Sequence, residues 1–183
     1  MKQTVTLDHL YEGCKARNRR AQEALYNTLA SKMLGLCMRY ARNREEAEDI
    51  LQTGFVKVFT QIDSFRGDGP FEGWIRRVMV NTAIASYRKN GRSIQVAELS
   101  EADSHSHDVG IDSLDCEDLL SIIRTLPVGY RLVFNMYAIE GYSHKEIAEA
   151  LQISEGASKS QLSRARGWLQ TKISQITAYE LKG

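Results

Sequence analysis

Apolar side chains recur at steps of three and four residues along most of this 183-residue chain. That spacing places them on one face of an α-helix. The pattern covers residues 21–41, 43–62, 71–90, 116–126, 129–141 and 143–151. Only two prolines, Pro70 and Pro127, occur in the chain, and strand-like alternation is rare. We therefore predict an all-α fold.

Residues 91 to about 115 interrupt the pattern. They lack hydrophobic periodicity and are rich in Ser, Asp, Glu and Gly, a composition typical of a flexible linker. We therefore predict two small helical bundles, residues 1–90 and 116–183, joined by a flexible acidic linker of residues 91–115.

The charge is unevenly distributed, although the formal net charge is only +1. Residues 94–121 contain eight acids and no Lys or Arg, whereas cations outnumber acids in residues 1–20, 60–93 and 154–183. Basic segments of this kind occur in nucleic-acid-binding proteins and also as ordinary solvated surfaces. The charge pattern alone leaves both interpretations open.

The three cysteines, Cys14, Cys37 and Cys116, are widely spaced, and no Cys-x-x-Cys occurs. This pattern argues against disulfides and a zinc ribbon and fits a reducing cytosol. His105 and His107 are too loosely spaced from Cys116 to predict a metal site. We therefore expect no metal and no cofactor. We also expect no membrane insertion, because no apolar stretch approaches the length of a span or a signal peptide.

Residues 143–170 have the pattern of a helix-turn-helix. Ser143 and Glu146 form a capping-box sequence at the start of a short helix. Three residues follow Leu151, and Ser154 can cap the next helix. That second helix carries small, polar and cationic side chains, as expected of a helix that enters the major groove. A helical hairpin with a polar outer face would explain the serines and arginines, but not the small leading residues beside a capped turn.

Small side chains let a helix approach the groove, while hydroxyls and long donors bind phosphates or base edges. On these grounds, the residues that we expect to contact DNA are Ser154, Gly156, Ser158, Lys159, Gln161 and Arg164.

Three segments together resemble a bacterial group-four (extracytoplasmic-function, ECF) sigma factor of the sigma-70 family. "AEDILQTGFVKVF" is similar to region 2.2, and "IDSFRGDGPFEGWIRRVMVNTAIASYRK" to regions 2.3 and 2.4. "LPVGYRLVFNMYAIEGYSHKEIAEALQISEGASKSQLSRAR" is similar to region 4. The resemblance spans residues from about 20 to 178. Two separate motif sets that occur in the family's order on either side of a linker are far more specific than either set alone. Ala157 and Ser158 stand where the family usually has a pair such as Thr-Val.

The resemblance implies a subunit that binds core RNA polymerase, reads the minus-ten and minus-thirty-five promoter elements and helps to open the DNA, with no catalysis of its own. It implies contacts with the β′ clamp helices and the β flap, and an anti-sigma partner that is often membrane-anchored. The residues assigned to the polymerase are Glu48, Asp49, Gln52 and Val56. Those assigned to the minus-ten element are Phe65, Arg66, Asp68, Phe71, Arg76, Arg77, Asn81, Arg88 and Lys89.

Each assignment has a plainer alternative. The polar residues at 48–52 would also suit a solvated helix face, and Phe65 and Phe71 could simply pin their loop to the core. For the whole chain, the chief alternative is a LuxR-type regulator, but residues 1–90 lack the alternating strands and acidic pocket of a receiver domain. A small α-helical enzyme would need paired functional groups, and no nucleophile–base pair or phosphate-binding glycine loop is found.

Overall fold

The computed structural model describes residues 6–89 and 116–180. All regular elements in these two ranges are helical, so the prediction of an all-α fold is confirmed. The chain divides into two compact units, Met1–Gly91 and Arg92–Gly183, which are described separately below. The predicted linker, with His105 and His107, lies outside the described residues, as does the side chain of Cys116.

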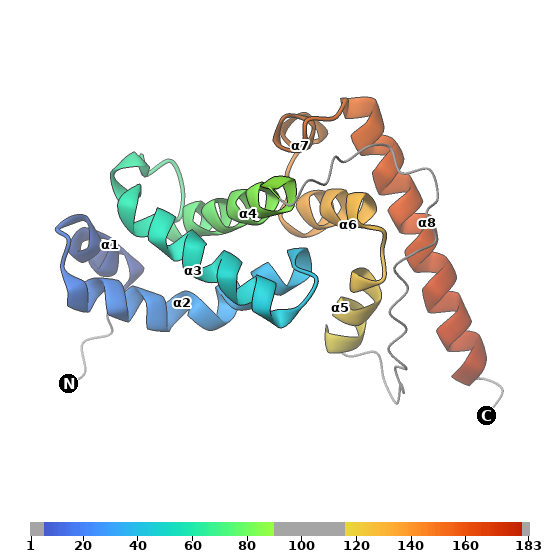
Figure 1. The fold of residues 1–183 in the computed structure, drawn as a ribbon, viewed down its shortest axis with the longest axis horizontal. Coiled ribbons are helices and arrows are strands. Elements are labelled where there is room, and N and C mark those ends of the chain that lie inside the picture. The colour runs from blue at the N-terminus through green and yellow to red at the C-terminus, as the bar shows by residue number, and fades with distance from the viewer. Residues whose placement is uncertain (1–5, 90–115, 181–183) are drawn as a thin grey trace. The chain divides into compact units, whose positions relative to one another are not determined.

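The first unit is a bundle of four α-helices and one short 3₁₀ turn. The elements are α1 (Leu7–Lys15), α2 (Arg19–Tyr40), α3 (Arg44–Thr60), η1 (Ile62–Ser64) and α4 (Phe71–Lys89). Helices α2, α3 and α4 pack against one another, and α1 packs on α2 and α4 (Figure 1). Helix α1 is an addition to the sequence-based expectation, because its nine residues bury only Leu10 and Cys14 and show no long periodicity.

In α2, α3 and α4, the core consists mainly of apolar positions within the predicted helical segments. Fully buried side chains include Leu25, Met33, Leu36, Val58, Ile75 and Met79. Cys14 and Cys37 are also buried. Burial raises the pKa of the Cys37 thiol to about 12, so the thiol stays protonated and behaves as a small core side chain.

Two glycines allow helices in this unit to approach closely. A Cβ atom at Gly13 of α1 would lie 2.5 Å from the Cβ atom of Ala21 in α2, and one at Gly54 of α3 would lie 2.2 Å from the sulfur of Met79 in α4. Both distances are far below van der Waals contact. The absence of a side chain at Gly13 therefore sets how closely α1 and α2 pack, whereas at Gly54 it makes room for the Met79 side chain.

The second unit contains the predicted helix-turn-helix. Its elements are α5 (Cys116–Arg124), α6 (Val128–Phe134), the π-helical turn η2 (Asn135–Ile139), α7 (His144–Leu151) and α8 (Glu155–Glu180). Both α6 and α7 pack against α8. Leu126, Tyr130 and Ala165 form a core cluster that Ile123, Phe134 and Leu169 extend. Pro127 separates α5 from α6, as the sequence predicts.

The helix predicted over residues 129–141 ends in a π-helical turn. The Glu140 amide donates to the Asn135 carbonyl at 3.0 Å, five residues back, instead of four. A single wider turn of five residues is too short for hydrophobic spacing to distinguish it from an α-helical one. Gly141, with φ of +76°, then reverses the chain in a conformation that favours glycine.

The capping box at the start of α7 is confirmed. The Ser143 hydroxyl accepts from the Glu146 amide at 3.2 Å, and the Glu146 carboxylate accepts from the Ser143 amide at 2.8 Å.

Within the described ranges, no helix combines the length and apolar character needed to cross a bilayer.

Candidate functional site

Helix α3 presents a mixed acidic and apolar face. The Asn43 side chain accepts from the Glu46 amide at 2.8 Å and fixes where the helix begins. Asp49, Gln52 and Val56 then lie three and four residues apart, and all three are exposed. Val56 is 61% exposed and lies next to Phe55 in the chain. An exposed apolar side chain beside acid and amide groups suits docking on another protein.

Glu48, the fourth residue predicted on this face, is half-buried. Its carboxylate accepts from Arg44 Nε at 2.7 Å, so it is already engaged within α3.

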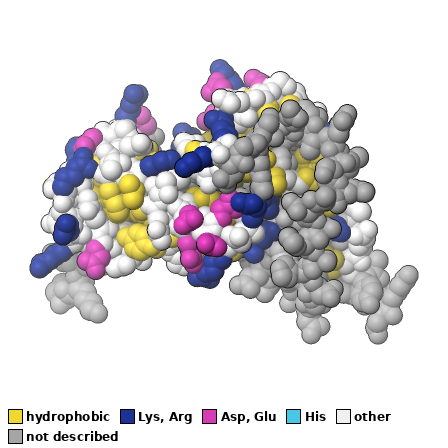
Figure 2. Space-filling model, viewed as in Figure 1, with side chains coloured by type: hydrophobic (Ala, Val, Ile, Leu, Met, Phe, Trp, Pro, Cys, Tyr) yellow, Lys and Arg dark blue, Asp and Glu magenta, His cyan; other side chains and the backbone are white. Residues whose placement is uncertain are grey.

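Tyr26 of α2, which is not among the predicted site residues, is a partly exposed ring that packs on Phe55, the neighbour of Val56 in α3. Its ring centroid lies 4.7 Å from that of Phe55 in α3, yet the side chain is 37% exposed. Figure 2 shows hydrophobic side chains grouped on the surface of this unit, with Lys and Arg side chains around them. Tyr26 lies three and seven residues before buried Leu29 and Met33, in phase with them, so the spacing predicts burial and gives no signal of its exposure.

An aromatic cluster anchors the loop between α3 and α4. The Phe65 ring lies 5.3 Å from Tyr11 and 5.2 Å from Phe71, and Trp74 lies 5.8 Å from both phenylalanines. Phe71 is only 4% exposed, whereas Phe65 is half-buried. Phe71 therefore anchors the loop in the core, and of the two phenylalanines only Phe65 retains exposed surface for a base to stack on.

The loop is also held from the turn between α1 and α2. The Arg17 guanidinium donates to the Phe59 carbonyl and, at 2.7 Å, to the Asp63 carboxylate. Arg17 itself has φ of +58°, a conformation uncommon for a non-glycine residue. Beyond this attachment, Arg66 and Asp68 are exposed in the loop.

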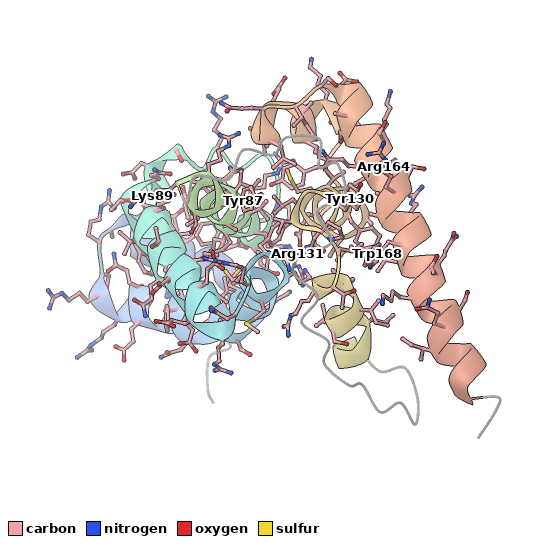
Figure 3. The ribbon with its side chains drawn as sticks, turned by 45° about the vertical axis from the view of Figure 1, so that its right-hand side comes forward. Tyr87, Lys89, Tyr130, Arg131, Arg164 and Trp168 are labelled. Carbon is pink, nitrogen blue, oxygen red and sulfur yellow. The ribbon has the colours of Figure 1, made fainter. Side chains whose placement is uncertain are left out.

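Helix α4 carries the remaining predicted residues of this unit. Arg77, Asn81 and Arg88 are exposed and lie four and seven residues apart, so they share one face. Arg76 is half-buried. Lys89, labelled in Figure 3, is exposed in the last turn, where a cation also favours the negative end of the helix dipole.

In the second unit, α8 begins as a helix-turn-helix requires. Gln152, with φ of +55°, ends α7, and the Ser154 hydroxyl accepts from the Ala157 amide at 3.0 Å. Leu162 and Ala165 are buried, and Leu169 extends the core cluster. Trp168 is 37% exposed and donates to the Thr125 hydroxyl at 3.5 Å.

The outward face of α8 follows from its buried face. Successive helical residues are about 100° apart, so the side opposite Leu162 and Ala165 consists of small residues, namely Gly156, Ser160, Ser163 and Gly167. Lys159 and Arg164, the latter labelled in Figure 3, are exposed on either side of this stripe. The cations therefore flank a surface where the backbone can come close to a partner.

Two residues predicted on this face lie in the interior instead. Ser158 is fully buried and Gln161 is only 3% exposed. They are three residues apart and fall on the same side as Leu162 and Ala165, so neither can reach a groove in this conformation. Ser160 and Ser163 hold the outward positions. The spacing of the buried residues, applied to the whole helix, would have identified them.

The buried Ser158 belongs to a polar contact between the two helices of the motif. Its hydroxyl lies 2.9 Å from His144 Nδ1 in α7. The His144 ring stacks on Tyr137 of η2 at 4.5 Å, and the Arg166 guanidinium lies 6.0 Å from the Tyr137 ring centroid. Through these contacts, side chains of η2, α7 and α8 pack against one another.

Comparison with known families identifies both units. The family described as "Sigma-70 region 2" matches residues 25–93, and "Sigma-70, region 4" matches residues 116–169. Among curated proteins, the ECF RNA polymerase sigma-E factor of Haemophilus influenzae is 29% identical over 96% of this chain and 100% of its own length. The RNA polymerase sigma-H factor of Pseudomonas aeruginosa is 29% identical over 86% of this chain and 88% of its own.

Two solved structures resemble the fold. The sigma factor RpoE of Bartonella quintana, in complex with the anti-sigma factor NepR, aligns with 83% of this chain and 96% of its own at a TM-score of 0.55 and 22% identity. CnrH, in complex with the cytosolic domain of CnrY, aligns with 91% of this chain and 96% of its own at a TM-score of 0.50 and 21% identity.

Proposed function

The chain belongs to the extracytoplasmic-function group of the sigma-70 family, and from this membership we propose how its surfaces divide the work of a sigma factor. As such a factor it binds core RNA polymerase and promoter DNA and directs transcription initiation. We propose that residues 1–90 dock on the polymerase and open the minus-ten element, and that residues 116–183 read the minus-thirty-five element.

Docking is assigned to the exposed face of α3. Asp49, Gln52 and Val56 line it, and Tyr26 extends its apolar part. An apolar centre with an acidic and amide border suits a basic helical partner, which we take to be the β′ clamp helices.

Strand opening is assigned to the loop at residues 65–71 and to α4. A single-stranded base can stack on Phe65, while Asn81 can bond a base edge and exposed arginines can bind phosphates. The aromatic cluster beneath the loop favours this role because it holds the half-exposed Phe65 ring in one place before DNA arrives.

Duplex reading is assigned to the outward face of α8. Gly156, Ser160 and Ser163 are small enough to let the helix enter the major groove, and Lys159 and Arg164 can reach phosphates or base edges from its flanks.

The proposal includes a cytoplasmic location, no catalysis by the chain itself, and control by an anti-sigma partner, which family members often meet at the membrane. The structural relative RpoE is bound to the anti-sigma factor NepR. A partner of that kind would compete for the surfaces that the polymerase and promoter need.

The observation that carries the proposal is that one chain contains both a region 2 and a region 4, in that order. The test is to reconstitute the chain with bacterial core polymerase and sequence the run-off transcripts made from a genomic library. We expect initiation at a defined set of promoters with the chain present and none with core alone. A chain that bound one operator tightly by itself, and gave no initiation with core, would be a regulator of the LuxR kind instead.

A further inference from the structure

The turn between α1 and α2 carries a group of cations to which the proposed function gives no role. Lys15, Arg17, Arg19 and Arg20 are all exposed, and we call them the basic corner. Figure 2 shows Lys and Arg side chains along the end of the first unit that carries α1 and the beginning of α2. The sequence shows an excess of cations in residues 1–20, but it does not indicate a partner for them.

The basic corner is not explained by helix stability. Arg19 and Arg20 occupy the first turn of α2, which contains no acidic residue. The amino-terminal end of a helix is its positive end, so cations there are unfavourable. Among the described residues no ion pair involves Arg19 or Arg20. Side chains whose position is unfavourable for local helix stability, and which have no compensating interaction, are often functional.

Two residues of the basic corner, Lys15 and Arg17, are held near the loop proposed to bind the opened strand. Arg17 is bonded to Asp63 at 2.7 Å, just before that loop. Lys15 Nζ lies 5.7 Å from the centre of the Tyr11 ring, and the Tyr11 ring lies 5.3 Å from Phe65. Lys15 is therefore linked to the half-buried Phe65 ring through Tyr11, and Arg17 is held just before the loop. Arg19 and Arg20 begin α2 two and three residues after Arg17.

We propose that the basic corner binds backbone phosphates of the single DNA strand whose base stacks on Phe65. Each nucleotide within that strand is flanked by a phosphate on either side, and guanidinium groups bind phosphate through paired donors. Arg17 is already bonded to Asp63, so Arg19, Arg20 and Lys15 supply most of the available charge. This inference rests on the proposed function of the loop and adds a binding surface to it.

The experiment uses the reconstituted holoenzyme and a premelted bubble template. The template carries the minus-ten element of a promoter found in the run-off experiment and lacks the minus-thirty-five duplex. Affinity is measured from 50 to 200 mM salt for the wild-type chain, for Arg19→Gln with Arg20→Gln, and for Lys145→Gln with Lys172→Gln. The last variant is the matched control, since it removes the same charge from exposed positions in the second unit, which this template does not engage.

Removing one phosphate interaction with a single strand lowers the slope of log affinity against log salt by about 0.7. Two such interactions are removed in the Arg19 and Arg20 variant, so we expect its slope to fall by about 1.4 and that of the control to stay unchanged. An unchanged slope and affinity in the first variant, or an equal fall in both variants, would overturn the inference. If the wild-type holoenzyme bound this template no better than core alone, the proposed function would fail first, so the two failures are distinguishable.

Stability provides a second readout. Removing cations from the first turn of α2 relieves an unfavourable interaction with the helix dipole, so the variant should unfold at the same temperature as wild type or slightly higher. Weaker binding together with a lower unfolding temperature would point to a folding defect and would count against phosphate binding.

Discussion

At the scale of single residues, a comparison of Gly13 with Gly35 separates the effect of close helix packing from that of helix propensity. Gly13 sits where a Cβ atom would overlap Ala21, whereas Gly35, in the middle of α2, has nothing within 4 Å of its added Cβ. Gly13→Ala should lower the free energy of unfolding by about 1–3 kcal/mol, because α1 would have to move away from α2.

Gly35→Ala is the matched control for that substitution. It adds the same methyl group to open space in a helix interior, so it should raise the free energy of unfolding by about 0.5–1 kcal/mol. Urea denaturation of both variants checks the pair. Equal effects at the two positions would mean that the α1–α2 crossing is looser than the structure has it.

The contact between His144 and Ser158 allows a second measurement at this scale. Removing the hydroxyl in Ser158→Ala should destabilise the second unit by about 1 kcal/mol, since a buried hydrogen bond is removed. A double-mutant cycle with His144→Ala isolates the pair, and we expect a coupling of about 0.5–1.5 kcal/mol. A coupling near zero would mean that Ser158 contributes through packing alone, as the apolar residue usual at this position in the family would.

At the scale of elements, α8 separates binding residues from packing residues. Arg164→Ala and Lys159→Ala should leave the stability of the second unit nearly unchanged, because both side chains are exposed. Either should weaken transcription from promoters that depend on the minus-thirty-five element. Removing a bidentate interaction with a base costs about 1–3 kcal/mol and relaxes one base position, whereas removing an interaction with a phosphate weakens all sequences alike.

Gln161→Ala is expected to behave differently from those two variants. Gln161 is buried, so its truncation should lower the unfolding temperature, with any decrease in transcription following from that. Thermal unfolding and run-off assays on all three variants make the comparison. A stable Gln161→Ala protein that no longer had base specificity would show that Gln161 leaves the core to meet DNA.

The same helix shows what the sequence could and could not predict. The capped turn, the helix boundaries and the buried Leu162 and Ala165 follow from local chemistry and spacing. The inward positions of Ser158 and Gln161 do not follow from residue type, because polar side chains usually face solvent; only their helical phase, in step with Leu162 and Ala165, places them inside. The contacts of Tyr11 and Arg17 could not be predicted for a different reason. Tyr11 in α1 contacts Phe65, and Arg17 in the turn after α1 contacts Asp63. These partners are far away in the chain, so no local pattern encodes them.

At the scale of the whole molecule, the two units assign different steps of one process to separate surfaces. The periodicity and the break at residues 91–115 predicted two helical bundles, and the chain does divide into two compact units. The exact domain limits and the flexible linker remain predictions. Within the first unit, the face on α3 and the loop before α4 belong to different elements, so docking and strand opening should be separable by mutation.

The final prediction tests that separation. Phe65→Ala or Asn81→Ala should leave holoenzyme assembly intact and impair strand opening. The first removes a base–aromatic stack worth about 1–3 kcal/mol, and the second removes a hydrogen bond to a base edge. Asp49→Ala with Gln52→Ala should instead lower the affinity for core polymerase, with promoter defects as a consequence. A core-binding titration, together with permanganate footprinting on duplex and premelted templates, measures both steps.

A premelted bubble should partly rescue the first pair of variants, since the cost of unpairing has already been met, and it should not rescue the docking variant. Phe65 is half-exposed and packs on Tyr11, Phe71 and Trp74. Truncating its ring should therefore remove a stacking surface for a base, while the other three rings still anchor the loop. If Phe65→Ala abolished core binding but opened DNA normally at saturating protein, the loop would belong to the docking surface and the assignment of the two surfaces would have to be exchanged.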